Sequence, residues 1–367
     1  MSFGLYIHIP FCRSKCPYCD FAFVVRQTHL AKQYSKAIVR ELQTQLAILN
    51  VEPIFNTLYF GGGTPSHISP QYIAQIIEAV PNLHKETEIT VEANPGDQAS
   101  FEALKQAGVN RLSLGIQALT DRALKALGRF HNTQDALDAF HTARRVGFDN
   151  MGIDLIFGAP NQTRQEWQEI LQKAIDLNPE HISVYGLTIE PDTNFDRRFQ
   201  KHQLPLPTET SQSDMYLDAI DQLTKANYEH YEISNFARPT FASRHNQSYW
   251  EGKPYLGLGL SAHSFINNKR IWNITDLQAY MQSVQNTGLA IASSETIDSD
   301  KQLLETIMLG LRRKTGLDVN LLKKHTPIPL QHLLKHNMLE NHQNRIRLTR
   351  KGLLVADAVC TELVKAL

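Results

Sequence analysis

The stretch Tyr6-Ile7-His8-Ile9-Pro10-Phe11-Cys12-Arg13-Ser14-Lys15-Cys16-Pro17-Tyr18-Cys19 contains three of the four cysteines of the chain. Apolar residues alternate with other residues from position 3 to position 9, which predicts a strand that leads straight into the cysteines. Three thiolates on one loop can bind a metal centre, but they leave one iron of a four-iron cluster without a protein ligand. The spacing therefore predicts a cluster held by Cys12, Cys16 and Cys19, with one open iron site where chemistry would occur.

These cysteines also allow three roles that involve no cluster. Spacings of four and three residues place side chains on one helix face, as buried core cysteines, although Pro10 and Pro17 oppose a helix. Disulfide bonds would need an oxidising compartment, and the first residues show no signal-peptide pattern. Cys16-Pro17-Tyr18-Cys19 after a strand also resembles a thiol–disulfide redox motif, which leaves Cys12 without a role.

Length and composition indicate a globular protein with a large core. The 367 residues are enough for two domains, or for one large domain with an appendage, and 42% of them are hydrophobic. The 37 Lys and Arg residues balance 37 Asp and Glu residues, so no overall field favours binding to nucleic acid or to an anionic membrane. No apolar run is long enough for a membrane span, and without a targeting segment we expect a cytoplasmic protein.

Short apolar strands alternate with amphipathic helices through the first two thirds of the chain. This alternation predicts a parallel α/β sheet, and polar or glycine residues follow the strands, as they do at the active rim of a (β/α) barrel. The pattern contains six units instead of eight, which predicts a partial (β/α)6 barrel of the TIM type over residues 1–270. The expected strands are residues 3–9, 57–60, 88–91, 111–116, 151–157 and 181–188, with a further strand near 228–234.

The alternation stops at about position 265, and residues 271–367 are predicted to form a helical, winged-helix-like domain. Helices are expected at 276–284, 300–313 and 317–334, then a hairpin at 338–348 and a last helix at 349–367. The cations Arg345, Arg347, Arg350 and Lys351 are interpreted as a solvated basic wing, because the net charge is zero. Cys360 lies on an apolar helix face and is expected to be a core residue.

The arrangement Cys-x3-Cys-x2-Cys after a strand resembles the radical S-adenosylmethionine (SAM) superfamily. That resemblance implies that the three cysteines bind a [4Fe-4S] cluster and that the amino and carboxylate groups of SAM occupy the open iron. The preceding Tyr-Ile-His-Ile-Pro-Phe-Cys resembles one branch of the superfamily. This branch contains the oxygen-independent coproporphyrinogen III dehydrogenases and the HemW haem chaperones.

Several polar residues and glycines at strand ends are candidates for a SAM site. In Gly61-Gly62-Gly63-Thr64-Pro65, the missing side chains would let the backbone approach a ligand closely. Buried polar groups at strand ends need partners, which a ligand or a structural hydrogen-bond network would supply. The resemblance implies SAM contacts at Tyr6, Tyr18, Gly62, Gly63, Thr64, Glu92, Gln117, Arg129 and Asp154, and less strongly at Gly186.

Two features separate the two members of this branch. The dehydrogenases have a further cysteine two residues after the third, where this chain has Phe21, and a longer segment before the first strand. The stretch Arg244-His245-Asn246-Gln247-Ser248-Tyr249-Trp250 matches the His-Asn-x-x-Tyr-Trp pattern of HemW, although a lone histidine is more often structural. An imidazole is a good axial ligand for haem iron, which makes His245 the candidate haem ligand.

These observations predict a haem chaperone that binds haem, a three-cysteine [4Fe-4S] cluster and exchangeable SAM. Its expected partners are an unidentified haem-acceptor protein, such as a respiratory one, and an electron donor. The alternative is an enzyme that oxidatively decarboxylates coproporphyrinogen III through a 5′-deoxyadenosyl radical. A thiol redox module is the third and weakest alternative.

Overall fold

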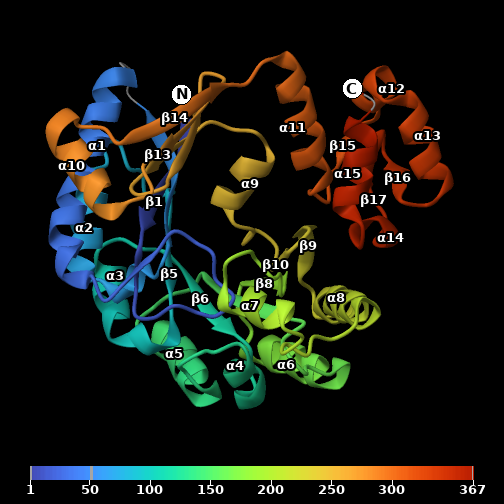
Figure 1. Cartoon of the computed structure of the whole chain (residues 1–367), viewed down its shortest axis with the longest axis horizontal. Coiled ribbons are helices and arrows are strands. Elements are labelled where there is room, and N and C mark those ends of the chain that lie inside the picture. The colour runs from blue at the N-terminus through green and yellow to red at the C-terminus, as the bar shows by residue number, and fades with distance from the viewer. Residues whose placement is uncertain (1, 50–52, 366) are drawn as a thin grey trace.

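One twelve-stranded sheet organises the computed structural model of the chain, which describes residues 2–49, 53–365 and 367 (Figure 1). Six parallel strands, β1, β4, β5, β6, β7 and β8, lie next to one another in that order. The predicted partial (β/α)6 barrel is therefore confirmed. The strands span Ser2–Ile9, Ile54–Gly62, Glu88–Ala93, Arg111–Gln117, Met151–Phe157 and His181–Gly186.

At least one helix follows each of these strands, and the helices lie on the outside of the sheet (Figure 1). The sequence pattern predicts one helical region after β6, through Arg144, but the structure has two helices there, because Gly128 and the residues after it interrupt the region. Helical periodicity over residues 30–50 predicts the first helix, and its last position, Asn50, lies outside the described residues. None of the described helices could cross a membrane. The helices are α1 (Ala31–Leu49), α2 (Pro70–Ala79), α3 (Phe101–Gln106), α4 (Asp121–Ala126), α5 (Thr133–Arg145), α6 (Arg164–Leu177), α7 (Asn194–Gln200) and α8 (Glu209–Lys225).

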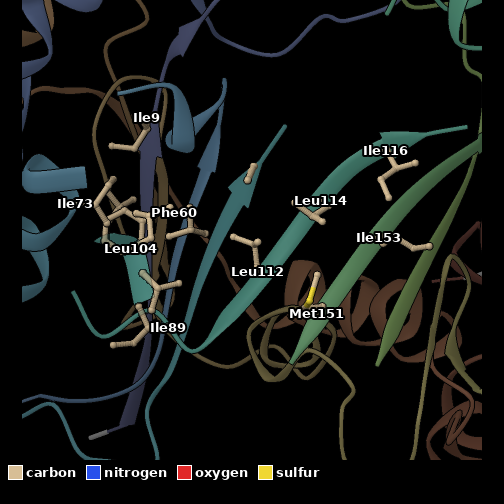
Figure 2. Packing of buried hydrophobic residues seen from close by; sticks show 14 of the residues in the cluster. Ile9, Phe60, Ile73, Ile89, Leu104, Leu112, Leu114, Ile116, Met151 and Ile153 are labelled. Atoms are coloured by element: carbon tan, nitrogen blue, oxygen red, sulfur yellow. The ribbon is translucent and has the colours of Figure 1, made fainter. Parts of the chain in front are cut away.

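The core lies between the parallel strands and these helices. Helix α1 buries Tyr34, Ile38 and Leu42, which recur every four residues and so share one face. Figure 2 shows other buried side chains of the same core, among them Leu112 and Leu114 on β6. Strands that are apolar over most of their length fit a parallel sheet, because helices cover one face and barrel contents the other.

Antiparallel strands extend the sheet on both sides. The strand expected near 228–234 is β9 (Glu229–Glu232), which pairs with β10 (Asn235–Ala237) in an antiparallel edge and adds no seventh unit. On the other side, β11 (Tyr255–Leu258) lies parallel to β1. Three antiparallel strands then follow in sequence, β12 (His263–Ile266), β13 (Lys269–Asn273) and β14 (Ile291–Thr296).

The last part of the chain has its own small sheet and its own core. The predicted hairpin is β16 (Leu339–His342) and β17 (Arg345–Leu348), which pairs with the short β15 (Leu317–Asp318). Its buried side chains form a second cluster, from Ile307 to Leu363. The helices are α11 (Ser299–Leu311), α12 (Val319–His325), α13 (Pro327–Lys335), α14 (Arg350–Leu353) and α15 (Ala356–Val364).

The C-terminal part is joined to the barrel along the free edge of β9. The Ile233 amide donates to the Arg312 carbonyl over 3.2 Å, and the Lys314 amide donates to the Tyr231 carbonyl over 3.0 Å. Position 366, in the last predicted helix, lies outside the described residues.

The division into domains at residues 270 and 271 stays a prediction. Since β14 extends the large sheet to Thr296, we propose a boundary between β14 and α11.

Glu41 is a fully buried carboxyl group that ties α1 to the antiparallel part of the sheet. It accepts hydrogen bonds from the Gly259 amide (2.9 Å), the Asn273 side-chain amide (2.6 Å) and the hydroxyl of Tyr280 (2.7 Å) on α10 (Leu277–Thr287). These donors come from three segments far away in the sequence, so the carboxyl group joins elements that have no local connection.

We expect Glu41→Ala to lower the free energy of unfolding by about 3 kcal/mol or more, because it leaves buried donors without an acceptor. Urea unfolding followed by circular dichroism measures the change. The exposed Glu78→Ala on α2 is the control and should change the free energy by less than about 0.5 kcal/mol. Equal effects of the two substitutions would contradict this account of Glu41.

Candidate functional site

The three cysteines lie on a loop at the carboxyl end of β1. After Pro10 the chain forms the short strand β2 (Phe11–Cys12), which pairs with β3 (Val24–Val25) and so closes the loop at its base. All three thiols are free and half-buried, and no helix includes them. The interpretation of these cysteines as one face of a buried helix is therefore wrong, because prolines and the β2–β3 pairing shape this loop.

The glycines after β4 hold the next loop tightly against this one. The Gly63 amide donates to the Ile9 carbonyl over 2.9 Å, and a Cβ atom at Gly63 would lie only 2.7 Å from the Pro10 backbone. Gly62 has a φ of +111°, and a Cβ atom there would collide with the His8 ring. Packing against the end of β1 thus requires glycine at both positions. The outcome is that Thr64 lies beside the cysteines, with its hydroxyl 3.6 Å from the Cys12 sulfur.

Arg129 brings a half-buried positive charge to the thiols. Its Nη1 donates to the Cys16 sulfur over 3.2 Å, and its Nη2 donates to the Gly115 carbonyl over 3.1 Å. From the sequence alone, Arg129 could also be a solvated cation at a helix end; the structure instead places it among these partners, and its Nε is buried with no partner in the described structure. A guanidinium next to thiols stabilises thiolates, which is the form that binds metal.

Burial has the opposite effect on two of the thiols, because it raises the pKa of both Cys12 and Cys19. It raises the pKa of Cys12 to about 11, although the Thr64 hydroxyl offsets part of this rise. The thiol of Cys12 is therefore protonated at neutral pH when nothing is bound, and metal binding would release that proton. Thiols that are free, half-buried and close to a guanidinium fit an anionic iron–sulfur cluster.

A cavity of about 750 Å³ begins at the cysteine loop and extends into the barrel. We call it the main cavity. Its lining includes the three cysteines and nearly every residue predicted to contact SAM, so the structure brings these positions together. The lining positions from the prediction are Tyr18, Gly62, Gly63, Thr64, Glu92, Gln117, Arg129, Asp154 and Gly186.

Tyr6 is the exception among the predicted SAM positions, since it does not line the main cavity. Its hydroxyl lies 3.0 Å from Nδ1 of His8, and its ring stacks on Tyr59 at 6.2 Å between centroids. Tyr59 lines the cavity in its place. Tyr6 thus stacks behind a residue that lines the main cavity, and its contact with SAM stays a prediction.

Two half-buried carboxyl groups lie in the wall of the main cavity. Glu92 accepts hydrogen bonds from the Tyr59 hydroxyl (2.8 Å) and the Gly62 amide (3.2 Å), and burial raises its pKa to about 7. Asp154 accepts a hydrogen bond from the Ser113 hydroxyl over 3.3 Å, and burial raises its pKa too. Acceptors of this kind can receive the amino group or the hydroxyl groups of a polar ligand.

Sequence reasoning missed several polar residues that line the main cavity, and four of these illustrate the omission. Two of them have a buried atom without a partner in the described structure, Oγ1 of Thr90 and Nδ1 of His181. Thr90 and Ser113 lie within strands, and Arg111 and His181 are the first residues of β6 and β8, so a rule based on the carboxyl ends of strands did not find them. Polar residues two apart in otherwise apolar strands were the available signal. The four residues are Thr90, Arg111, Ser113 and His181.

His245 lies in α9 (Arg244–Trp250), whose first turn is held by Glu88 at the start of β5. Its Nδ1 is 2.8 Å from the Thr57 hydroxyl, and its Nε2 is 2.8 Å from the Tyr249 hydroxyl. The ring is buried, stacks on Tyr59 at 4.9 Å and does not line the main cavity. Both ring nitrogens are thus engaged within the protein, and neither is open to a metal in this conformation.

A model of the radical SAM superfamily matches residues 6–174, and a model of the HemN C-terminal domain matches residues 297–355. The chain is 33% identical to a protein named heme chaperone HemW from Bacillus subtilis, over 96% of this chain and 97% of that protein. The chain belongs to the HemW family. A HemW of Synechocystis is 38% identical over 86% of this chain and 79% of its own length.

A solved structure agrees with this HemW assignment. The fold matches coproporphyrinogen III oxidase (HemN) from Escherichia coli, described as a radical SAM enzyme, with a TM-score of 0.85 and 25% identity. The match covers 100% of this chain and 90% of that one. Membership of the radical SAM superfamily implies a [4Fe-4S] cluster and SAM as cofactors, and the free thiols and orphaned polar atoms of the main cavity fit both groups.

Proposed function

We propose that this HemW family member binds haem and transfers it to an acceptor protein. The names of its full-length relatives support the haem part of the proposal. The observation that carries the cofactor part is that three free cysteines, Arg129 and two half-buried carboxyl groups line one cavity. The acceptor would be a protein that needs haem, and an electron donor would be required wherever the cluster is reduced.

Each group in the main cavity has a role in this proposal. Cys12, Cys16 and Cys19 would hold the cluster. When reduced, a bound cluster would supply one electron to SAM. Arg129 would offset the negative charge of the cluster beside Cys16, and the loop at Thr64 would hold Cys12 in place. Exchangeable SAM would be bound by Glu92 and Asp154 on the wall of the cavity.

The alternative function is oxidative decarboxylation of coproporphyrinogen III. The likeness to the HemN structure over the whole chain favours it. Phe21 opposes it, because the dehydrogenase pattern has a cysteine there, and the Phe21 ring is 65% exposed beside the cluster loop. A large exposed ring cannot replace a thiolate as a metal ligand.

The proposal predicts haem binding without porphyrinogen conversion. Anaerobically reconstituted chain should bind about one haem and, given SAM, reductant and coproporphyrinogen III, should form no protoporphyrinogen IX. Haem titration by absorbance and product analysis by chromatography make the two measurements. Conversion that is lost in Cys12→Ala would overturn the chaperone proposal and establish the enzyme alternative.

Transfer is tested separately with haem-depleted acceptors. The haem-loaded chain should restore the spectrum of an apo-haemoprotein from the respiratory chain faster than free haem does at the same concentration. Restoration at the rate of free haem would show binding without a chaperone function.

A further inference from the structure

A second cavity, of about 410 Å³, lies beside the main cavity and separate from it. We call it the side cavity. It is formed by β1, β11, β12 and β13 with α9 and α11, and α9 contacts both β4 and α11 (Figure 1). The Tyr6, Tyr59 and His245 rings stack between the two cavities. The lining residues used below are Tyr249, Trp250, Tyr255, Ser261, His263 and Phe265.

The walls of the side cavity are mostly aromatic. Tyr249 and Tyr255 meet edge to face at 4.6 Å between centroids, and Trp250 and Phe265 complete the aromatic lining. Such rings favour a flat apolar ligand, because they offer a large contact area at little cost in conformational entropy. Nε1 of Trp250 and Oγ of Ser261 are buried without a partner in the described structure, so the lining also holds polar atoms not yet satisfied.

Two histidines line this cavity, and they differ in what their nitrogens can do. His8 is engaged on both sides, with Nδ1 3.0 Å from the Tyr6 hydroxyl and Nε2 2.6 Å from the Ala22 carbonyl. His263, on β12, is exposed and stacks on Trp272 at 6.0 Å, and neither of its nitrogens has a hydrogen-bond partner among the described residues. A free imidazole nitrogen beside aromatic walls is what haem iron requires.

We propose that haem binds in the side cavity with His263 as its iron ligand, and that His245 acts as a positioning residue. This inference rests on the proposed haem-binding function. The Nε2 of His245 holds the Tyr249 hydroxyl, so His245 fixes the ring that forms one wall of the cavity. The His-Asn-x-x-Tyr-Trp motif would then shape the haem site through Tyr249 and Trp250, and the iron bond would come from another strand.

The ionisation of the lining agrees with this choice of ligand. Partial burial of the ring, and then the nearby Arg270, lower the pKa of His263, so its imidazole is neutral at pH 7 and can bind a metal. Burial raises the pKa of Tyr249 and Tyr255, so both remain phenols and are poor iron ligands. The propionates would lie toward Arg270 and Lys253 on the lining. Arg270 is paired with Glu305 over 2.7 Å, so a propionate there would compete with that carboxylate.

The test compares three histidine variants of the full chain after haem titration. We expect His263→Ala to weaken haem binding at least about tenfold and to remove the histidine signature from the ferric paramagnetic resonance spectrum. Added imidazole should restore that signature in His263→Ala. The control is His342→Ala, which removes another exposed histidine from a strand, β16, and should leave both readouts unchanged.

His245→Ala separates ligation from positioning. We expect weaker binding with an unchanged ligand signature, because the wall loses its support while His263 stays in place. A lost signature in His245→Ala with an unchanged one in His263→Ala would overturn the inference and leave the proposed function intact. If the unmodified chain binds no haem at all, the proposed function fails first. Cluster content, measured in each variant, shows that the barrel has folded.

Discussion

Alanine in place of Cys12, Cys16 or Cys19 is expected to abolish the iron–sulfur cluster of this chain. The unmodified chain should take up about four iron and four sulfide ions on anaerobic reconstitution. With one ligand removed, two thiolates remain, and two protein ligands hold a cubane cluster poorly. Iron and sulfide analysis together with the cluster absorbance measures the loss. SAM should perturb the cluster signal of the unmodified chain.

Cys360→Ala is the matched control, because it removes the fourth cysteine of the chain. Cys360 packs against the second core, in a different part of the fold from the loop of β2 and β3, and burial raises its pKa to about 11. Its removal should leave the cluster intact. A stable cluster in Cys12→Ala, with a Cys16–Cys19 disulfide couple that disappears in Cys19→Ala, would favour the thiol redox interpretation over the cluster.

SAM affinity is expected to fall as the pH falls below about 7, because Glu92 would then lose its charge. Burial raises the pKa of Glu92 to about 7, so protonation removes the negative charge that would attract the cationic groups of SAM. If binding needs the carboxylate, affinity drops by up to about tenfold per pH unit below that value and is flat above it. Asp154 and Arg129 line the same cavity, and neither residue is changed in the variant used to test this prediction.

Glu92→Gln provides the decisive comparison, since it keeps the shape of the side chain and removes the titration. Its SAM affinity should be lower at pH 7.5, roughly tenfold, and nearly independent of pH from about 5.5 to 7.5. Anaerobic equilibrium dialysis of the reconstituted chain gives the affinities, and the exposed Glu102→Gln on α3 is the control. A pH profile of Glu92→Gln that parallels the unmodified chain would assign the dependence to another group.

The cysteine loop and the six parallel strands could be predicted because their signals are local. Cys12, Cys16 and Cys19 lie within eight residues on one loop, and each strand is bounded by turn residues. The position of β11 could not be predicted in the same way. It pairs with β1 from more than 240 residues further along the chain, and only tertiary packing decides which strand covers that edge.

Side-chain roles were harder to predict than side-chain positions. The motif around His245 drew attention to α9, but the ring nitrogens of His245 are engaged by Thr57, from β4, and by Tyr249. Tyr6 and Tyr59 lie opposite each other on β1 and β4, and the sequence cannot say which ring covers the other. These outcomes depend on which distant side chains meet, and a single sequence carries no direct record of such contacts.

The join between β9 and the C-terminal part has a consequence for the solubility of the protein. A sheet that does not close into a barrel leaves two edge strands, and exposed strand edges promote aggregation between molecules. At one edge, the backbone of residues 312–314 pairs with β9 and covers part of its free hydrogen-bonding groups. At the other, β14 presents the polar run Ser293-Ser294-Glu295-Thr296, whose hydroxyl and carboxylate groups favour water over a second chain. The C-terminal part thus acts as an edge protector, and without it β9 would be open to pairing with another copy.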